Sequence, residues 1–553
     1  MGATQIAILN FILSLLVLGF LYFKRHFHPL VIIVILSLLP LISIFRPGVY
    51  QSGDMQIHAT KTLEFTSSLL EGHLIPRWAG NLNGTYGYPL WQFTYSTPYY
   101  LTSLLHLFGF SAISSVKLFL TFSYLLAGIG MFLICKRHLP DHAALVSAIF
   151  YQFAPYHLVD LHYRVAMGEL SALMILPWCF YFINLKKLLP ASLSISFLIL
   201  SHPALSLLSL PLIILYSRKF PYPLLFGLGL SAFYWLPAIF ESQFTLRSIF
   251  PFTISFVNFK DLFFSPWLFG LLFQGPSGQL SPSLGLSHWL IIIPAIYLAF
   301  VKKSNLLIFC LLLFLLYTFL TTRISAPVWH QFPFLQNTQF SYRLLGILIL
   351  ITSFIAGLVT SYLSPKSPLI YILIVLTVIV SSANWANRTM LPYIDDQFLS
   401  DNLPYLTATP GMTEGHEAAP KWVNPQNPWH LYLPASPITV LSGAADITPL
   451  IRSSTKHSYF ISVKEPAILQ ENTLYFPGWT LLANGSPQLF IYPEGIITFI
   501  LPTGTYKLDL VYENTPIRSL SQGLSLSVLV FLILLLLYRS KAPILPHKTN
   551  SFN

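Results

Sequence analysis

Long apolar runs separated by short polar breaks make up most of the chain as far as residue 382, and one more run lies near its end. A helix needs about 20 apolar residues to cross a bilayer, and fewer where neighbouring helices shield it. By this criterion the pattern predicts about 13 membrane-spanning helices. They lie at residues 5–23, 29–45, 113–134, 142–157, 170–185, 189–201, 204–217, 220–238, 286–301, 305–320, 343–362, 367–382 and 521–538.

Composition supports this membrane assignment. Only 9% of the 553 residues are charged and 54% are hydrophobic, whereas soluble chains carry about 25% charged residues. A soluble enzyme, a nucleic-acid-binding protein and a disordered chain are therefore excluded. The three cysteines all lie in apolar stretches, which excludes an external disulfide framework and a cysteine zinc site; they are Cys135, Cys179 and Cys310.

The net charge of +11 indicates topology, because lysine and arginine hold short loops on the cytoplasmic side. With the N-terminus outside, the predicted spans place all the basic breaks and the short basic tail in the cytoplasm. An additional span at residues 90–110 would move most of them outside, so we expect that segment to lie along the outer interface as an amphipathic, aromatic-rich helix. The basic breaks are Lys24-Arg25, Lys136-Arg137, Lys186-Lys187, Arg218-Lys219, Lys302-Lys303 and Lys366, and the tail carries Arg539, Lys541 and Lys548.

Three loops and one large segment then project outward. The loops cover about 46–112, 241–285 and 321–342, and the segment is residues 383–520. Ile496–Leu501 and Thr505–Tyr512 alternate with period two around Pro502-Thr503-Gly504, which predicts antiparallel hairpins. We expect a membrane domain at 1–382, an extracytoplasmic β-rich domain at 383–520, and a last helix with a cytoplasmic tail at 521–553.

Few acids occur in the membrane domain, and most of them fall on the outer side. Asp54 follows the second predicted span, and His58 shares its face if the segment is helical. Two interpretations stay open for Asp54. It acts as a general base or holds a divalent cation, Mg²⁺ or Mn²⁺, or it only caps the following helix.

Other outward residues carry chemistry as well, each with a plainer structural alternative. Arginines among aromatic side chains at the interface suit a lipid phosphate, because guanidinium binds phosphate in a bidentate manner. Anchoring, snorkelling and structural ion pairing are the alternatives. The candidates are Arg77, Arg164 and Arg343 for phosphate, Glu169 and Glu241 as further acids, and Trp78, Tyr86, His202 and Gln339 as cavity lining.

An ordered set of short motifs resembles a family of bacterial membrane proteins called "6-pyruvoyl-tetrahydropterin synthase-related", which is grouped with GT-C type glycosyltransferases and YfhO-like proteins. The motifs extend over nearly the whole chain. They are Gly53-Asp54 with His58, Ile75-Pro76-Arg77-Trp78, Tyr86-Gly87-Tyr88-Pro89, Pro98-Tyr99-Tyr100, Arg164 with Glu169, His202, Leu230–Pro237 with Glu241, Gln339–Arg343, and Tyr475-Phe476-Pro477-Gly478-Trp479. Nothing in the chain resembles the soluble pterin synthase, so pterin chemistry is set aside.

The resemblance implies a GT-C-like helical bundle, a polyprenyl-phosphate sugar as donor, and an acid of the first external loop in catalysis, which is Asp54 by position. It also implies an acidic residue on the acceptor side at Glu417, although Glu417-Ala418-Ala419-Pro420 departs from the family's acid-Tyr-Leu-Pro pattern. The predicted activity is sugar transfer to an extracytoplasmic polysaccharide, lipid or protein. The alternative is a transporter or an assembly factor of the envelope without enzymatic activity.

Overall fold

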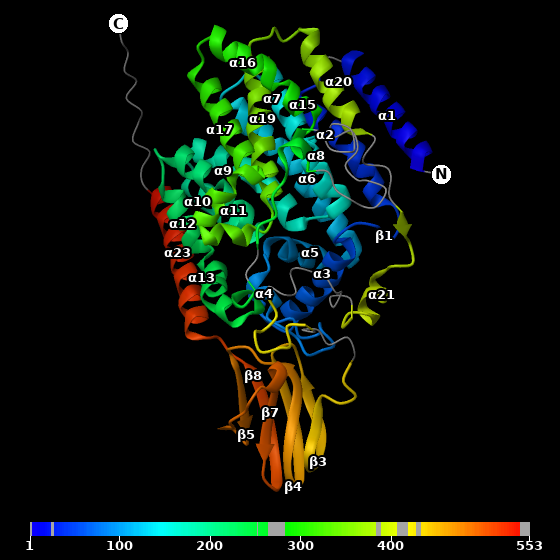
Figure 1. Cartoon of the computed structure of the whole chain (residues 1–553), viewed down its shortest axis with the longest axis vertical. Helices are drawn as coiled ribbons and strands as arrows, with labels where there is room; N and C mark the ends of the chain where they lie inside the picture. Colours follow the sequence, from blue (N-terminus) through cyan, green and yellow to red (C-terminus); the bar gives the residue numbers. More distant parts are fainter. Residues whose placement is uncertain are drawn as a thin grey trace.

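The computed structural model describes residues 3–23, 27–250, 253–263, 282–382, 389–405, 418–426 and 433–541. Most helices form one large body, the sheet lies at its lower end, and a layer containing α3, α4, α5 and α21 lies between the two (Figure 1). These four helices are Met55–Leu70, Leu90–Phe93, Thr97–Leu107 and Asp396–Asp401.

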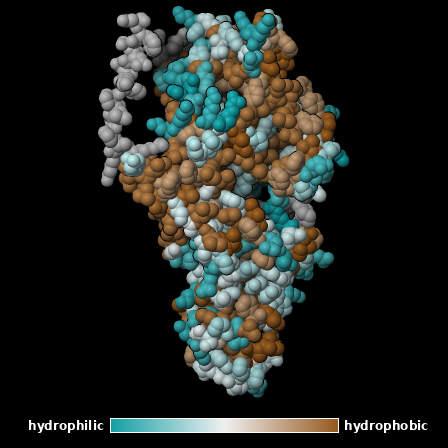
Figure 2. Space-filling view, turned by 90° about the vertical axis from the view of Figure 1, so that its left-hand side faces the viewer, coloured by the Kyte–Doolittle hydropathy of each residue, from teal (hydrophilic) through white to brown (hydrophobic). Residues whose placement is uncertain are grey.

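An apolar helix, or a pair of helices, lies at every position where the sequence predicts a span. Hydrophobic side chains gather over this helical part, and the sheet domain is more mixed (Figure 2). The helices are α1 (Ala3–Phe23), α2 (Pro29–Leu41), α6 (Ala112–Lys136), α7 (Asp141–Gln152), α8 (Pro155–Val159), α9 (Met167–Asn184), α10 (Leu188–Ser201), α11 (Pro203–Ser217), α12 (Tyr222–Leu230), α13 (Ala232–Glu241), α15 (Leu286–Leu290), α16 (Ile292–Val301), α17 (Asn305–Thr321), α19 (Leu345–Thr360), α20 (Pro368–Ser382) and α23 (Pro516–Lys541).

Length separates these helices into two classes. Within the described residues, α6, α9, the stretch Ser341–Thr360 and Pro516–Tyr538 are long and apolar enough to cross a membrane, and the pair α12–α13, bent by 66°, adds a fifth crossing if it is one span. The other apolar helices have 10–17 residues. The chain is therefore a helical membrane protein with four or five candidate spans, and the count of about 13 stays a prediction.

A helix break at His202 falls inside a long apolar stretch of the chain. His202 separates α10 from α11, and its Nδ1 accepts a hydrogen bond from the backbone N–H of Leu205 over 3.1 Å. Pro203 follows at the first position of α11, where its missing N–H costs nothing. The predicted segments 189–201 and 204–217 are thus two helices that meet at a capped break.

Helix α5 lies where the sequence predicts an amphipathic interfacial helix. It has 11 residues, which is too short to cross a bilayer. Its buried face carries Thr97, Tyr99 and Thr102, whereas Leu104 and Leu107 are each 49% exposed. An outward apolar face on a short helix fits a position along the membrane surface.

The sheet is antiparallel and is organised around β4 (Lys456–Leu474). Its strand order is β3-β4-β8-β5-β6, and β7 also pairs with β4. The remaining strands are β3 (Ile438–Arg452), β5 (Trp479–Ala483), β6 (Ser486–Pro487), β7 (Ile496–Leu501) and β8 (Gly504–Tyr512). The predicted β-rich character of residues 383–520 is confirmed for this part.

The predicted hairpin between β7 and β8 is wrong. Ala467 in β4 pairs with Leu501 in β7, and Val463 in β4 pairs with Gly504 in β8. The two strands therefore run one after the other along the same edge of β4. Pro502 has no N–H and cannot donate a hydrogen bond to β4. Pro502-Thr503 therefore separates two strands that continue in the same direction, and the chain does not reverse there as predicted.

The sheet domain is held against the first loop by hydrogen bonds of side chains on both sides. The carboxylate of Glu71, just after α3, accepts hydrogen bonds from the backbone N–H of Ser454, over 2.9 Å, and from its hydroxyl. Arg452 Nη2 donates to the carbonyl of Thr85 over 3.0 Å. A two-stranded sheet of β1 (Val49–Tyr50) and β2 (Met390–Leu391) ties the start of the same loop to the segment after α20.

Candidate functional site

A buried cluster of charges lies where α9 and α19 begin. Glu169, in the first turn of α9, accepts at Oε1 from Arg164 Nη2 over 2.8 Å and from Arg343 Nε over 3.1 Å. Its Oε2 accepts from the hydroxyl of Tyr156, and His202 Nε2 lies 3.9 Å from Oε1. The structure therefore joins Arg164 and Glu169, which are close in sequence, to His202 and Arg343, which the sequence predicts separately.

Asp160 is a fifth member of the cluster. It begins a π-helical turn over Asp160–Arg164, and its Oδ1 accepts from Arg164 Nη1 over 2.5 Å. The next residue, Val165, has a φ of +56°, which is a strained conformation for a β-branched side chain. A π-turn and a strained residue together are typical of functional sites.

Two carboxylates face two guanidinium groups in this cluster: Asp160 and Glu169 bind Arg164, and Glu169 also binds Arg343. Burial, reinforced by the negative charge of Glu169, raises the pKa of Asp160 well above its ordinary value. Protonation of Asp160 leaves Glu169 alone to face both guanidinium groups, which favours binding of an anion. The side chains of Arg164 and Arg343 are 15% and 13% exposed.

Asp54 is joined to this cluster through the backbone. Its N–H donates to the carbonyl of Arg164 over 2.9 Å, and the N–H of Gly53 donates to the carbonyl of Tyr163 over 2.8 Å. Asp54 occupies the N-cap position of α3, but its side chain makes no capping hydrogen bond. Ser52 Oγ accepts from the N–H of Met55 over 3.2 Å instead. Helix capping therefore does not account for the Asp54 carboxylate.

His58 lies one turn further along α3 and is buried. Its Nδ1 is 2.8 Å from the hydroxyl of Tyr99 on α5. Tyr99 stacks on Tyr95, and the ring of Tyr95 lies 6.0 Å from that of His202. A line of aromatic side chains thus connects His58 to the cluster around Glu169.

Arg77 and Glu241 belong to a second cluster, so the structure does not place Arg77 with Arg164 and Arg343, the other two candidate phosphate-binding arginines. Arg77 donates to Gln92 Oε1 over 2.9 Å and to the carbonyl of Phe233 over 2.7 Å. Glu241 receives two hydrogen bonds from Arg518 on α23, over 3.0 and 2.9 Å. The second cluster joins α13 to the last helix. The pattern of predicted spans did not indicate that Arg518, at the start of that helix, is the partner of Glu241.

The residues predicted to line one cavity do not lie together: His202 is beside Glu169, whereas Trp78 and Tyr86 contact the sheet domain. Trp78 packs against Trp479 and Tyr512 of the sheet domain. It lines, together with Arg77, a pocket of about 330 Å³ between the first loop and that domain. Tyr86 is half-buried and its carbonyl accepts from the N–H of Leu474.

The last two predicted site residues are Gln339 and Glu417. Gln339 lies four residues before Arg343, has a φ of +62° and is bonded through its carbonyl to Ser255. Glu417, predicted on the acceptor side, lies outside the described residues.

A divalent cation at Asp54 stays a prediction. Among the described residues, no group of three or more His, Cys, Asp and Glu side chains is placed to hold a metal ion. Asp160 and Glu169, the two acids of the buried cluster, already bind Arg164.

The sequence interpretation missed two acids. Asp160 stands four positions before Arg164, a spacing that pairs opposite charges on one helical face. The sequence alone could therefore have identified Asp160 as a partner of Arg164. Glu64 is buried in α3, where its carboxylate accepts from the backbone N–H and from the side chain of Asn81 over 3.2 and 2.9 Å. Burial raises the pKa of Glu64 to about 7; no sequence pattern indicates this.

Comparisons with known proteins give distant likenesses. No family model matches the chain. An uncharacterised protein of Lactococcus lactis subsp. cremoris is 24% identical over 205 residues, which cover 35% of this chain and 33% of that protein. The chain thus matches about a third of its relative's length. The resemblance to the pterin synthase-related family stays a prediction.

Two solved structures also resemble the chain. Both are of the arabinofuranosyltransferase AftD from mycobacteria, one of them a mutant, and they are 14% identical with TM-scores of 0.40 and 0.41. The matches cover 64% of this chain and only 26% and 27% of the AftD chains. Likenesses this distant carry no argument about activity, so the function is argued from the site itself.

Proposed function

We propose that the chain is a membrane glycosyltransferase that moves a sugar from a polyprenyl-phosphate donor to a hydroxyl group of an extracytoplasmic polysaccharide, lipid or protein. One observation carries the proposal. The backbone of Asp54 is bonded to the backbone of Arg164, whose guanidinium lies with that of Arg343 on Glu169. A carboxylate and two arginines thus belong to one rigid junction.

The arginine pair suits the donor phosphate. A guanidinium presents five N–H donors in a fork that matches phosphate oxygens. Arg164 uses two of its nitrogens on Asp160 and Glu169, and Arg343 uses Nε on Glu169 and Nη1 on the carbonyl of Thr338. These bonds fix the direction of both groups and leave further N–H donors for a phosphate.

The transfer step assigns one role to each group. Asp54 accepts the proton of the acceptor hydroxyl, whose oxygen forms the new bond to the anomeric carbon of the sugar. The bond between that carbon and the phosphate oxygen breaks, and its electron pair leaves on the lipid phosphate. Arg164 and Arg343 stabilise the negative charge that develops there.

We assign the 330 Å³ pocket beside Trp78 to a distal part of a long acceptor. Ser68, near the end of α3, lines this pocket and lies about 21 Å along the helix from Asp54, so the acceptor must extend from the pocket to reach the carboxylate. The first loop contributes Arg77 and Trp78, and the sheet domain and the segment after it contribute Thr455, Tyr512 and Glu513. Aromatic rings and a few polar groups at the edge of a concave site are typical of small-molecule recognition. In this assignment the sheet domain holds the acceptor above the membrane.

The test is a transfer assay on purified protein with radiolabelled polyprenyl-phosphate sugars. We expect label in the acceptor fraction with wild type and at least a hundredfold less with Asp54→Asn, since general-base catalysis contributes about 10²–10⁴. Running the assay with and without EDTA tests the cation at Asp54. Equal transfer by wild type and Asp54→Asn would show that Asp54 is not the general base of the transfer.

A transporter without enzymatic activity is the second candidate, and the broken helices favour it. Transporters bind substrates where interrupted helices meet, and here α10–α11 breaks at His202, next to Glu169, while α12–α13 bends by 66°. Lipid-phosphate sugar that crosses vesicle membranes unchanged, in both wild type and Asp54→Asn, would favour this candidate over the enzyme.

A further inference from the structure

A second pocket lies at the far end of the helical body from the charge cluster. Helix α9 relates the two sites. Glu169 is in its first turn, and Phe180, Ile183 and Asn184 near its end line the pocket. Fifteen residues at about 1.5 Å per residue place Asn184 roughly 22 Å from Glu169 along the helix. The pocket is therefore separate from the proposed transfer site.

The pocket is large and its walls are apolar. Its volume is about 710 Å³, within the range of about 300–1,000 Å³ that is usual for small-molecule sites. The walls come from α6, α9, α11, α17 and α19. They include Met131, Leu212, Leu306, Phe309, Leu313 and Phe354. Leu306 and Phe309 are 47% and 41% exposed, so the cavity opens on the apolar outer surface of the helical body.

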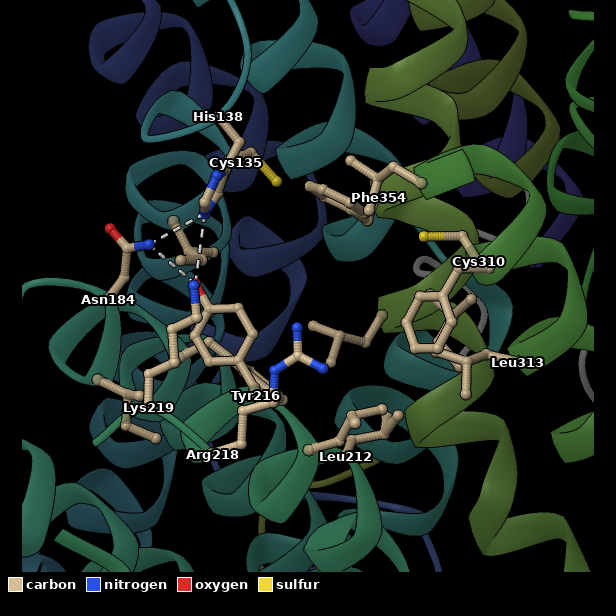
Figure 3. A pocket seen from close by; sticks show the side chains of 18 of the residues that line it. Cys135, His138, Asn184, Leu212, Tyr216, Arg218, Lys219, Cys310, Leu313 and Phe354 are labelled. Carbon is tan, nitrogen blue, oxygen red and sulfur yellow. Dashed lines mark hydrogen bonds between the residues drawn. The ribbon is translucent and has the colours of Figure 1, made fainter. Parts of the chain in front are cut away.

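The edge of the pocket is polar and basic. His138 Nε2 lies 3.2 Å from Asn184 Nδ2 and 3.3 Å from the hydroxyl of Tyr216, and Asn184 Nδ2 donates to that hydroxyl over 3.1 Å. Arg218, directly after α11, extends its guanidinium into the middle of the pocket (Figure 3). Lys186 and Lys219 complete the edge.

These three basic side chains carry unbalanced charge. Within the described part of the chain, no carboxylate forms an ion pair with Lys186, Arg218 or Lys219. An apolar cavity that opens towards lipid and has an unbalanced cationic edge is complementary to one kind of molecule, with hydrocarbon chains at one end and a negative headgroup at the other.

We propose that this pocket is a binding site for an anionic phospholipid of the bilayer. Its acyl chain fills the space between α11, α17 and α19, and its phosphate is bound by Arg218 and Lys219, with Asn184 and Tyr216 as neutral hydrogen-bonding partners. Basic pockets between membrane helices bind such headgroups. The lipid fastens α17 to α6 and α9, and it takes no part in sugar transfer.

Native mass spectrometry of the full chain, purified from bacterial membranes in mild detergent, tests the proposal. We expect a bound anionic phospholipid on wild type and roughly a tenfold or greater loss of occupancy on Arg218→Ala/Lys219→Ala, at about 1 kcal/mol for each basic residue. The matched control is Lys302→Ala/Lys366→Ala. It removes the same charge from two exposed sites that do not line the pocket and should keep the lipid.

A second measurement uses wild type alone, in case the double variant does not fold. Delipidated protein is mixed with phosphatidylglycerol, phosphatidylcholine or inorganic phosphate, and its unfolding temperature is measured. We expect stabilisation by phosphatidylglycerol only. Equal stabilisation by both lipids, or by free phosphate, would overturn the proposal, and so would full lipid retention by Arg218→Ala/Lys219→Ala.

Discussion

Arg343 and Glu169 stand 174 positions apart in the chain, yet Arg343 Nε donates to Glu169 Oε1 over 3.1 Å. This ion pair joins the start of α19 to the start of α9. Glu169 also holds Arg164, which lies beside Asp54. Removing a member of the pair therefore affects both the packing of the helices and the arrangement of the proposed site.

We expect Arg343→Met to lower the stability of the chain markedly. Breaking one partner of a buried ion pair costs about 3–5 kcal/mol, and the lower value applies because Arg164 still neutralises Glu169. Thermal unfolding in detergent measures the loss. Arg323→Met is the control, because Arg323 is an exposed arginine and makes no ion pair with any described residue. Unfolding of Arg343→Met at the wild-type temperature would contradict this role.

The pKa of Glu64 predicts a specific pH dependence. Burial raises it to about 7 in the fold, against about 4.3 in unfolded chains. Between these values the folded state binds the additional proton, so stability falls as the pH rises, and the full penalty of about 4 kcal/mol applies above pH ~7. Glu64→Gln should therefore gain stability relative to wild type from pH ~5 to pH ~8.

Unfolding temperatures across that pH range measure the effect of Glu64→Gln. Glu465→Gln, on the exposed surface of the sheet domain, serves as the control and should follow wild type throughout. Parallel curves for wild type and Glu64→Gln would show that the carboxyl of Glu64 does not change its protonation state in this range.

Gly80 allows the first loop and the sheet domain to approach each other. A Cβ at this position would lie 2.6 Å from the Cα of Ser454. Gly80→Ala must therefore push the two backbones apart, at a cost of about 1–3 kcal/mol. We expect faster proteolysis of the sheet domain in this variant. Gly523→Ala, where nothing lies within 4 Å of the added Cβ, should be cleaved at the wild-type rate.

Local patterns in the sequence predicted the elements of this fold well, because apolar runs and caps act over a few residues. The separate helices on either side of His202 and an interfacial helix at α5 were predicted from such signals. The hairpin prediction for β7 and β8 failed because both strands pair with β4. Strand pairing depends on which distant segments lie beside a strand. The alternation of apolar and polar residues within one strand does not identify those segments.

The site was predicted in part for the same reason. Arg164 and Glu169 are close in sequence, so their pairing was visible, whereas the partners Glu169–Arg343 and Glu241–Arg518 are separated by long stretches of chain. The sequence therefore assigned Arg77 to the wrong group. Asp160 was recognisable from its spacing to Arg164, and Glu64 was not, because its properties depend on burial alone.

The role of the Asp54 carboxylate is tested by measuring donor binding and sugar transfer separately in Asp54→Asn. Ser52→Ala is the matched control, because it removes the hydrogen-bonding cap of α3, costs about 1 kcal/mol and leaves the carboxylate in place. We expect Asp54→Asn to bind labelled polyprenyl-phosphate sugar as wild type does but not to transfer it, whereas Arg164→Gln loses binding and Ser52→Ala keeps both activities. Transfer by Asp54→Asn at the wild-type rate would show that Asp54 is not the general base.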